Sequence, residues 1–270
     1  MKSFKEFKEG FGINKIILPL MLMIFLMTGC GNSDDINKLV IGIDEGFAPM
    51  SFHDEKNILV GFDIDLARET ARRMGVAVEF KPIDWDKKEE AITSGSVDLI
   101  WNGLDITDER KEYMIFSKPY MDDRQIPLVK KDSDWDISSE YDLAGKIIGT
   151  QAGSTSDDYI NKNLKLKNNL KGYKTYGKFN DLVVALKNNE IEVIICDELV
   201  ARYEMTIHPD EFKIINAKIG VITQTGIGFA KNNPKLRDKV QKAFDEMISD
   251  GTAQKISQKW FHGDLIKVYR

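Results

Sequence analysis

The chain has 270 residues, of which 42% are hydrophobic and 30% are charged, and its formal net charge is -5. This is the composition of an ordinary soluble protein, long enough for one large or two medium domains, and we expect two. The lysines and arginines are dispersed, which argues against nucleic acid as a partner, because a nucleic-acid-binding protein needs a clustered basic face.

The first thirty residues differ from the rest of the chain. Four lysines within residues 2–15 precede an apolar block at 16–27, and this order predicts a secretory signal that is too short to span a bilayer comfortably. The block ends in Leu-Met-Thr-Gly-Cys, which resembles a bacterial lipobox. We therefore expect residues 1–29 to be a signal peptide and Cys30 to be lipidated. An uncleaved anchor and a signal without lipidation are the alternatives.

Residues 30–36 are short, polar and glycine-containing, as suits a tether between a lipid anchor and a folded body. The protein would then be extracytoplasmic and held on the outer face of the bacterial cell membrane. If Cys30 carries lipid, Cys196 has no partner within the chain, so a disulfide-based fold is excluded. A solitary cysteine of this kind is most often a small buried hydrophobe.

Strand-like and helix-like segments alternate after the tether. Residues 38–43 predict a strand, and an acidic and aromatic loop follows at 44–49. From Gly61 to Gly75 apolar residues recur every three or four positions, which predicts a helix with Asp63 as a candidate cap. A strand at 76–80, a helix at 85–92 and a buried strand at 97–100 complete this unit. The alternation predicts an α/β fold with a mainly parallel sheet.

A second unit repeats this order. It has predicted strands at 146–150 and 191–196 and predicted helices at 154–163 and 179–187. Residues 91–100 match residues 185–194 class by class without a gap, and residues 42–44 match 149–151. By this register Asn102 and Gly103 correspond to Cys196 and Asp197. Although the repeat is weak, it predicts two similar lobes whose polar loops, at the carboxyl ends of the strands, face each other across a cleft.

The remainder of the chain returns to strand and helix patterns. We expect a helix from Asp197 to about residue 207, a short strand at 226–230 and an amphipathic helix at 232–248. Trp260 and Phe261 then act as packing anchors of a last helix.

Seven short segments, spread in order over nearly the whole mature chain, resemble those of the type II extracellular solute-binding proteins that deliver polar amino acids to ABC transporters. They are residues 47–50, 61–66, 97–100, 106–110, 116–120, 149–154 and 259–261. The resemblance implies a type II periplasmic-binding-protein fold, with two α/β lobes joined by two hinge crossovers near 121–124 and 221–225. Lobe 1 would comprise residues 37–121 plus 225–270, and lobe 2 residues 122–224.

The resemblance also implies the residues that hold a free amino acid. Arg110 occupies the position whose guanidinium binds the ligand carboxylate, and a planar guanidinium can bond a carboxylate at two points. Backbone N–H groups of Ser154 and Thr155, at the start of a helix, would hold the same carboxylate. Asp197 matches the carboxylate that accepts from the ligand ammonium, with help from the Gly103 carbonyl.

Asp105 departs from the family, which commonly places threonine or serine there. This carboxylate could bind the ammonium or reach a basic group on the ligand side chain. It could also point away and pair with a lysine, and aspartates in loops are commonly turn formers. Phe47 and Trp85 match the aromatic positions beside the ligand side chain, although Trp85 could equally be a core residue. The other ligand-binding candidates lie on strand-end loops: Asp44, Asn102, Gln151 and, behind them, Cys196 and Trp101, of which Trp101 could also be core.

Together these features predict a non-enzymatic, monomeric, membrane-tethered receptor that hands a polar L-amino acid to the permease of an ABC importer, without cofactor or metal. Asp44, Glu45 and Asp105 favour a cationic ligand, whereas Gln151 and Cys196 would suit a neutral polar or cystine-like one. A dehydratase of the same fold is an alternative, yet His53, His208 and His262 lie outside the strand-end loops. A sensory module would require a transmembrane segment and a signalling domain, and neither is recognised.

Overall fold

The structure is a computed structural model that describes residues 36–268. The expected signal peptide, Cys30 and most of the tether therefore lie outside the described residues. Within residues 36–268, every helix is too short or too polar to cross a membrane.

The first sheet contains both the beginning of the described chain and a strand from near its end. The strand order is β5-β1-β6-β14-β7, with β5, β1 and β6 parallel and β14 antiparallel to both of its neighbours. The strands are β1 (Lys38–Ile43), β5 (Ala77–Pro82), β6 (Leu99–Ile100), β7 (Met114–Phe116) and β14 (Gly228–Ala230). A small antiparallel sheet follows β1 and consists of β2 (Gly46–Phe47), β3 (Ser51–His53) and β4 (Leu59–Val60).

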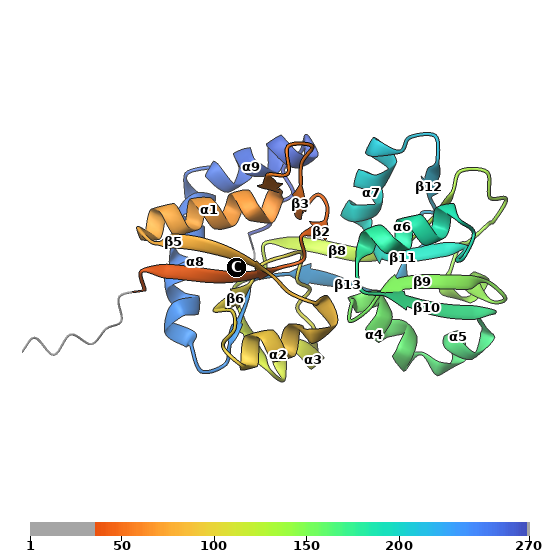
Figure 1. Ribbon diagram of the computed structural model, residues 1–270, viewed down its shortest axis with the longest axis horizontal. Helices are drawn as coiled ribbons and strands as arrows, with labels where there is room; N and C mark the ends of the chain where they lie inside the picture. Colours follow the sequence, from red (N-terminus) through yellow and green to blue (C-terminus); the bar gives the residue numbers. More distant parts are fainter. Residues whose placement is uncertain (1–35, 269–270) are drawn as a thin grey trace, which may run out of the picture. The chain divides into compact units, whose positions relative to one another are not determined.

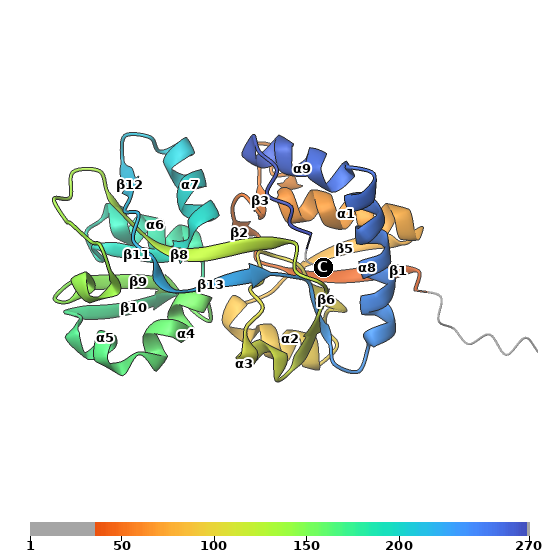
Figure 2. The ribbon, with the colours of Figure 1, turned by 180° about the vertical axis from the view of Figure 1, so that it is seen from behind.

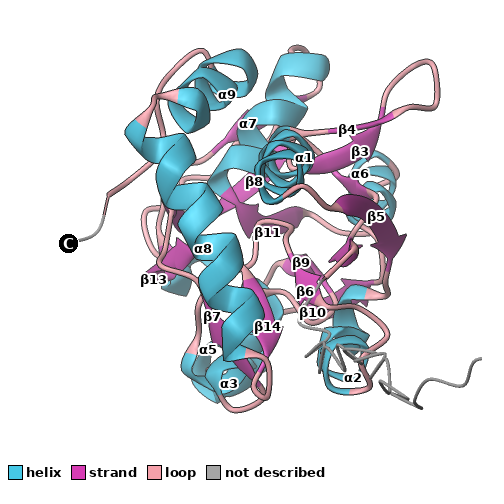
Figure 3. Ribbon diagram, turned by 90° about the vertical axis from the view of Figure 1, so that its left-hand side faces the viewer, coloured by secondary structure: helices cyan, strands magenta, loops and turns pink. Residues whose placement is uncertain are grey.

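Helices cover both sides of this sheet, with α1 on one side and α2 on the other (Figure 1). Helices α1, α8 and α9 pack against one another (Figure 3). The helical segments are α1 (Phe62–Met74), η1 (Trp85–Lys87), α2 (Lys88–Thr93), α3 (Asp108–Lys111), α8 (Pro234–Ser249) and α9 (Thr252–Phe261). The apolar residues of α1 recur at helical spacing and are buried, as predicted.

One expectation about α1 is wrong. Asp63 does not cap the helix; Gly61 is the N-cap residue, without a side-chain cap, and Asp63 lies in the first turn and is fully buried. Trp101 is a core residue, since its ring meets that of Phe244 edge to face at a centroid distance of 5.7 Å. Tyr120 packs on the same Phe244 ring at 5.6 Å.

The second sheet has the order β10-β9-β11-β8-β12, and β13 pairs with β8. Its strands are β8 (Met121–Lys130), β9 (Ile147–Gln151), β10 (Gly172–Tyr176), β11 (Val193–Asp197), β12 (Phe212–Ile214) and β13 (Ile219–Thr225). The helices are η2 (Glu140–Leu143), α4 (Thr155–Lys162), α5 (Leu164–Asn169), α6 (Phe179–Lys187) and α7 (Glu198–Ile207). Within this sheet β10, β9 and β11 pair in parallel, while β8 runs antiparallel to β11, β12 and β13. Each sheet therefore has one strand that runs against the others, β14 in the first and β8 in the second, and the expectation of mainly parallel sheets is confirmed.

Strands β8 and β13 form an antiparallel pair that runs between the two sheets (Figures 1 and 2). The Tyr120 N–H donates to the Thr225 carbonyl (2.9 Å) where the chain leaves the first sheet and where it returns. Both predicted crossovers fall in these strands, while the exact lobe boundaries stay a prediction. The predicted internal repeat is also present: α2 leads into β6 beside β1, and α6 leads into β11 beside β9.

Candidate ligand-binding cleft

Strand ends and helix starts from both lobes line one cleft. The lining residues are Phe47, Trp85, Gly103, Asp105, Arg110, Gln125, Gln151, Ser154, Thr155, Phe179, Ile195, Cys196 and Asp197. Most of the residues expected to bind a ligand are among them. The side chains leave about 20 Å³ between them, roughly the space of one water molecule. An amino acid can therefore enter only when the two lobes move apart.

Arg110 is buried at the centre of the contact between the lobes, with 2% of its surface exposed. The Thr107 hydroxyl caps α3 by accepting from the Arg110 N–H, which sets Arg110 in the first turn. Its Nη1 donates to the Asp105 carbonyl (2.9 Å) and its Nη2 to the Gly153 carbonyl of the second lobe (3.3 Å). Among the described residues, no acceptor meets its Nε. The guanidinium is thus held by backbone and keeps a donor for an anion.

Three carboxylates converge on the other side of the cleft. One oxygen from each of Asp105, Asp123 and Asp197 lies within 4.8 Å of the others. The Gln125 amide donates to Asp197 (2.6 Å) and to Asp123 (3.0 Å), and the Thr155 hydroxyl donates to Asp105 Oδ2 (2.6 Å). Asp105 Oδ1 is buried and has no partner among the described residues. Asp105 therefore points into the cleft and is not a solvated turn former.

The backbone of Gly103 forms part of the cleft wall. Its φ of +52° lies in the left-handed region, where glycine is the least strained residue. A Cβ at this position would come within 3.1 Å of the Phe47 ring. Glycine therefore allows the main chain and the aromatic ring to approach each other closely, and both line the cleft.

In the second lobe, Ser154 caps α4 by accepting from the Asp157 N–H (3.1 Å). The Ser154 N–H donates to the Gln151 carbonyl (3.1 Å), so this group already has a partner, and the Thr155 N–H is the better candidate of the two for an anion. The Gln151 side chain donates to Asp44 Oδ2 (2.5 Å) in the first lobe. This bond joins the two residues that the internal repeat aligns.

Asn102 and Asp44 do not belong to the lining of the cleft. The Asn102 side chain accepts from the Asp44 N–H (3.2 Å) and from the Ser51 hydroxyl, so it holds the loop after β1. Asp44 is buried and also accepts from the Gly46 N–H (2.9 Å). A direct ligand contact of either residue stays a prediction.

The family model for bacterial extracellular solute-binding proteins, family 3, matches residues 39–263. The chain belongs to this family. Among its relatives, the arginine-binding extracellular protein ArtP of Bacillus subtilis is 32% identical over 258 residues, which are 92% of this chain and 98% of that protein. The L-cystine-binding protein TcyJ of Escherichia coli is 30% identical over 85% of this chain and 84% of its own length.

Solved structures agree with this membership. A substrate-binding protein of an ABC uptake transporter from Streptococcus pneumoniae, with bound histidine, superposes with a TM-score of 0.81 at 35% identity, over 86% of this chain and 95% of that one. An ancestral arginine-binding protein bound to arginine has a TM-score of 0.78 at 38% identity, over 84% and 99% of the two chains. The fold of this solute-binding protein is therefore the two-lobed type II fold.

Burial shifts the ionisation of the three carboxylates in the solute-binding cleft. Burial, followed by the charge of Asp105, raises the pKa of Asp197 to about 7. Burial also raises the pKa of Asp105, although the Arg110 guanidinium acts in the opposite direction. The pKa of Asp123 lies well above its usual range because of burial and the neighbouring Asp197. With its pKa at about 7, Asp197 is partly protonated near neutral pH when no cation lies between the carboxylates.

The three carboxylates could hold a metal ion or an ammonium group. The Gln125 amide already donates two N–H bonds into the group, and Arg110 is close enough to lower the pKa of both Asp105 and Asp197. A cation that donates its own hydrogen bonds fits the remaining oxygen lone pairs, such as that of Asp105 Oδ1.

Several residues in or next to the solute-binding cleft were not predicted. Gln125 and Asp123 lie on the crossover strand β8, which was interpreted only as a hinge. Phe179 starts α6 and meets the Phe47 ring edge to face, at a centroid distance of 6.1 Å. Lys88 is buried, and its Nζ donates to the Gly153 carbonyl across the lobe contact (2.7 Å). Asp123 and Gln125 were missed because the segment around 121–124 was interpreted as a crossover, and Lys88 lies inside the predicted helix at 85–92.

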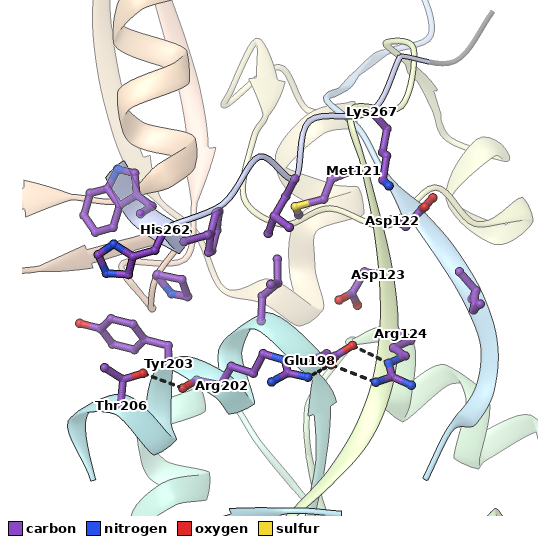
Figure 4. A pocket seen from close by; sticks show the side chains of 16 residues that line it. Met121, Asp122, Asp123, Arg124, Glu198, Arg202, Tyr203, Thr206, His262 and Lys267 are labelled. Carbon is purple, nitrogen blue, oxygen red and sulfur yellow. Dashed lines mark hydrogen bonds and ion pairs between the residues drawn. The ribbon is translucent and has the colours of Figure 1, made fainter. Parts of the chain in front are cut away.

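A larger cavity, of about 630 Å³, lies beside the crossover strands (Figure 4). Arg124 and Arg202 both donate to Glu198 in its wall, Arg124 from Nη2 at 3.0 Å and Arg202 from Nε at 2.9 Å. It shares no lining residue with the solute-binding cleft, although Asp123 in its wall lies next to Asp105 and Asp197 of that cleft. The convergence of Arg110 with buried carboxylates identifies the smaller cleft as the candidate site, because these groups match the two charged ends of an amino acid.

Proposed function

We propose that this solute-binding protein captures a free L-amino acid with a positively charged side chain and delivers it to an ABC importer, without converting it chemically. The observation that carries the charge preference is the excess of buried carboxylates over cations. Asp105 and Asp197 line the cleft, and Asp123 and Asp44 lie behind it, so four buried or half-buried carboxylates face two buried cations, Arg110 and Lys88.

The carboxylate end of the ligand would meet Arg110. Its Nε and the Thr155 N–H at the start of α4 are donors from opposite lobes. An anion between them would draw the lobes together, because each lobe supplies part of its hydrogen bonds. The interaction is strong because it is charge-assisted and removed from water.

The ammonium end would meet Asp197 and Asp105, together with the Gly103 carbonyl. The buried Asp105 Oδ1, which has no partner among residues 36–268, is an acceptor that an ammonium would satisfy. The ligand side chain would then lie between Phe47, Trp85 and Phe179, in the direction of Gln151. A guanidinium or ammonium on that side chain would offset the remaining negative charge.

The cellular setting is part of the same proposal. Cys30 would carry the lipid that holds the protein on the outer face of the membrane, and residues 31–36 would act as the tether to the folded lobes. Relatives named for binding arginine and cystine support a role as a binding protein. None of His53, His208 and His262 lines the cleft, so a histidine general acid for a dehydratase has no support there.

A thermal-shift screen of the twenty amino acids with cystine and ornithine tests this function, because a ligand that binds only the folded state raises the melting temperature. We expect the largest shifts with arginine, lysine or ornithine. A larger shift with cystine or glutamine would refute the charge preference alone. No shift with any amino acid, followed by no heat of binding in calorimetry, would refute the function.

A further inference from the structure

Asp63 is a fully buried carboxylate that lies behind the cleft. It sits in the first turn of α1 and has 0% of its surface exposed. Its Oδ2 accepts from the Gly103 N–H (2.6 Å) and its Oδ1 accepts from the Tyr120 hydroxyl (2.9 Å). It is not among the residues that line the cleft, so its effect on a ligand must pass through its neighbours.

The groups that face Asp63 come from two segments, the loop after β6 and the residue before β8. They are the Gly103 N–H and the Tyr120 hydroxyl, which donate to it, and the indole N–H of Trp101, which lies near it without a hydrogen bond; all three groups are neutral. Burial nevertheless raises the pKa of Asp63 to about 6. An ionised Asp63 is thus stabilised by hydrogen bonds from neutral groups and not by a cation. Hydrogen bonds to an ionised carboxylate are stronger than bonds between neutral groups, so they hold their donors firmly in one orientation.

Both bonded neighbours have a role in ligand capture. Gly103 supplies cleft wall in a left-handed conformation, with φ of +52°, and its carbonyl is a proposed acceptor for the ligand ammonium. Tyr120 directly precedes the crossover strand β8, and its N–H donates to Thr225 at the end of β13. A single carboxylate therefore joins the backbone of the binding loop to the point where both crossovers leave the first lobe.

We propose that Asp63 is a positioning residue for ligand binding: its ionised carboxylate fixes the Gly103 peptide in the binding orientation and ties it to the hinge at Tyr120. The proposal rests on the proposed amino-acid-binding function. Protonation of Asp63 replaces a charge-assisted bond to Gly103 with a weaker neutral one. Because the ligand-bound form favours the ionised carboxylate, affinity is complete well above pH 6 and falls as the pH drops through 6.

The test compares Asp63→Asn with Asp65→Asn, a matched control on the same helix. Asp65 accepts from Lys259 Nζ (2.6 Å) and Trp260 Nε1 (2.9 Å) on α9, away from the cleft. L-Arginine affinity is measured by calorimetry from pH 5 to pH 8. We expect Asp63→Asn to bind about tenfold more weakly than wild type at pH 8, and the two to become nearly equal at pH 5.

The ratio of the two affinities isolates Asp63, since Asp105, Asp123 and Asp197 titrate in both proteins. A purely structural role would lower the melting temperature of Asp63→Asn but leave this ratio independent of pH, and that result would overturn the proposal. The Asp65→Asn ratio should stay near one throughout. A second variant, Tyr120→Phe, keeps the Gly103 bond and removes a donor that stabilises the ionised form, so the pH at which its affinity falls should lie above that of wild type.

A ligand-independent measurement separates this proposal from the proposed function. In the wild type the amide proton resonance of Gly103 should titrate with a midpoint near pH 6, and Asp63→Asn should abolish that titration. If the resonance titrates as expected but no amino acid binds, the function fails while the Asp63–Gly103 coupling stands. A Gly103 resonance that does not respond to pH would refute the coupling itself.

Discussion

Replacement of Arg110 by methionine tests the centre of the cleft. The side chain is almost fully buried and its Nη atoms bond to backbone carbonyls from both lobes. Methionine keeps much of the volume but leaves a buried ligand carboxylate without its charge partner. Such a loss costs about 2–5 kcal/mol, which is about 30- to 4,000-fold in the dissociation constant.

Titration calorimetry with L-arginine at pH 8 measures this change, and circular dichroism verifies that the variant is folded. Lys111→Met is the matched control, because Lys111 is the next residue on α3, is exposed, and within residues 36–268 pairs only with the exposed Asp108 at 2.9 Å. We expect the control to bind as the wild type does. An Arg110→Met protein that is folded and binds L-arginine within about threefold of wild type, a change of less than 1 kcal/mol, would refute the assignment of Arg110 to the carboxylate.

Asp197→Asn should weaken binding by a factor comparable to that of Arg110→Met while the fold survives, because the amide cannot balance the ligand ammonium; equal calorimetric affinity of the two proteins would place the ammonium elsewhere. Because the pKa of Asp197 is raised to about 7, the ligand ammonium should displace a proton from Asp197 as it binds. Ligand affinity should therefore fall by up to about tenfold per pH unit below pH 7. Calorimetry in buffers of different ionisation enthalpy should detect the released proton. Between pH 4 and 7 the raised pKa of Asp197 also means that the folded, ligand-free protein binds more protons than the unfolded chain. The contribution of Asp197 to the free energy of unfolding should therefore decline as the pH rises from 4 to 7, and urea unfolding at pH 5 and pH 8 would measure this decline. Gly149→Val should lower the melting temperature by about 2–12 °C, because even a Cβ there meets Ile191 Cδ1 at 2.4 Å, and an unchanged melting temperature would mean that the core relaxes freely.

Local pattern was sufficient to predict most of the helices and strands. The recurrence of apolar residues from 62 to 74 follows helical spacing, and α1 spans those positions. The gapless match of 91–100 with 185–194 correctly predicted two helix-turn-strand units, because each buries its strand beside another parallel strand. Periodicity carries this information, since one face of each element must be apolar wherever it packs. The short helix that carries Arg110 was not predicted, although threonine, the residue at position 107, is a typical N-cap.

Only the tertiary structure showed the direction of the strands and the partners of the buried carboxylates. The local sequence pattern does not determine the direction in which a strand pairs, so the antiparallel pairing of β14 within the first sheet was not predicted. Asp63 has the sequence position of a helix cap, yet the fold turns it inward to Gly103 and Tyr120, residues 40 and 57 positions away. Asp123 joins Asp105 and Asp197 only because the crossover strand passes the ends of both lobes. Which carboxylates share a proton or a ligand depends on distances between segments that are remote in sequence, and only the folded chain sets those distances.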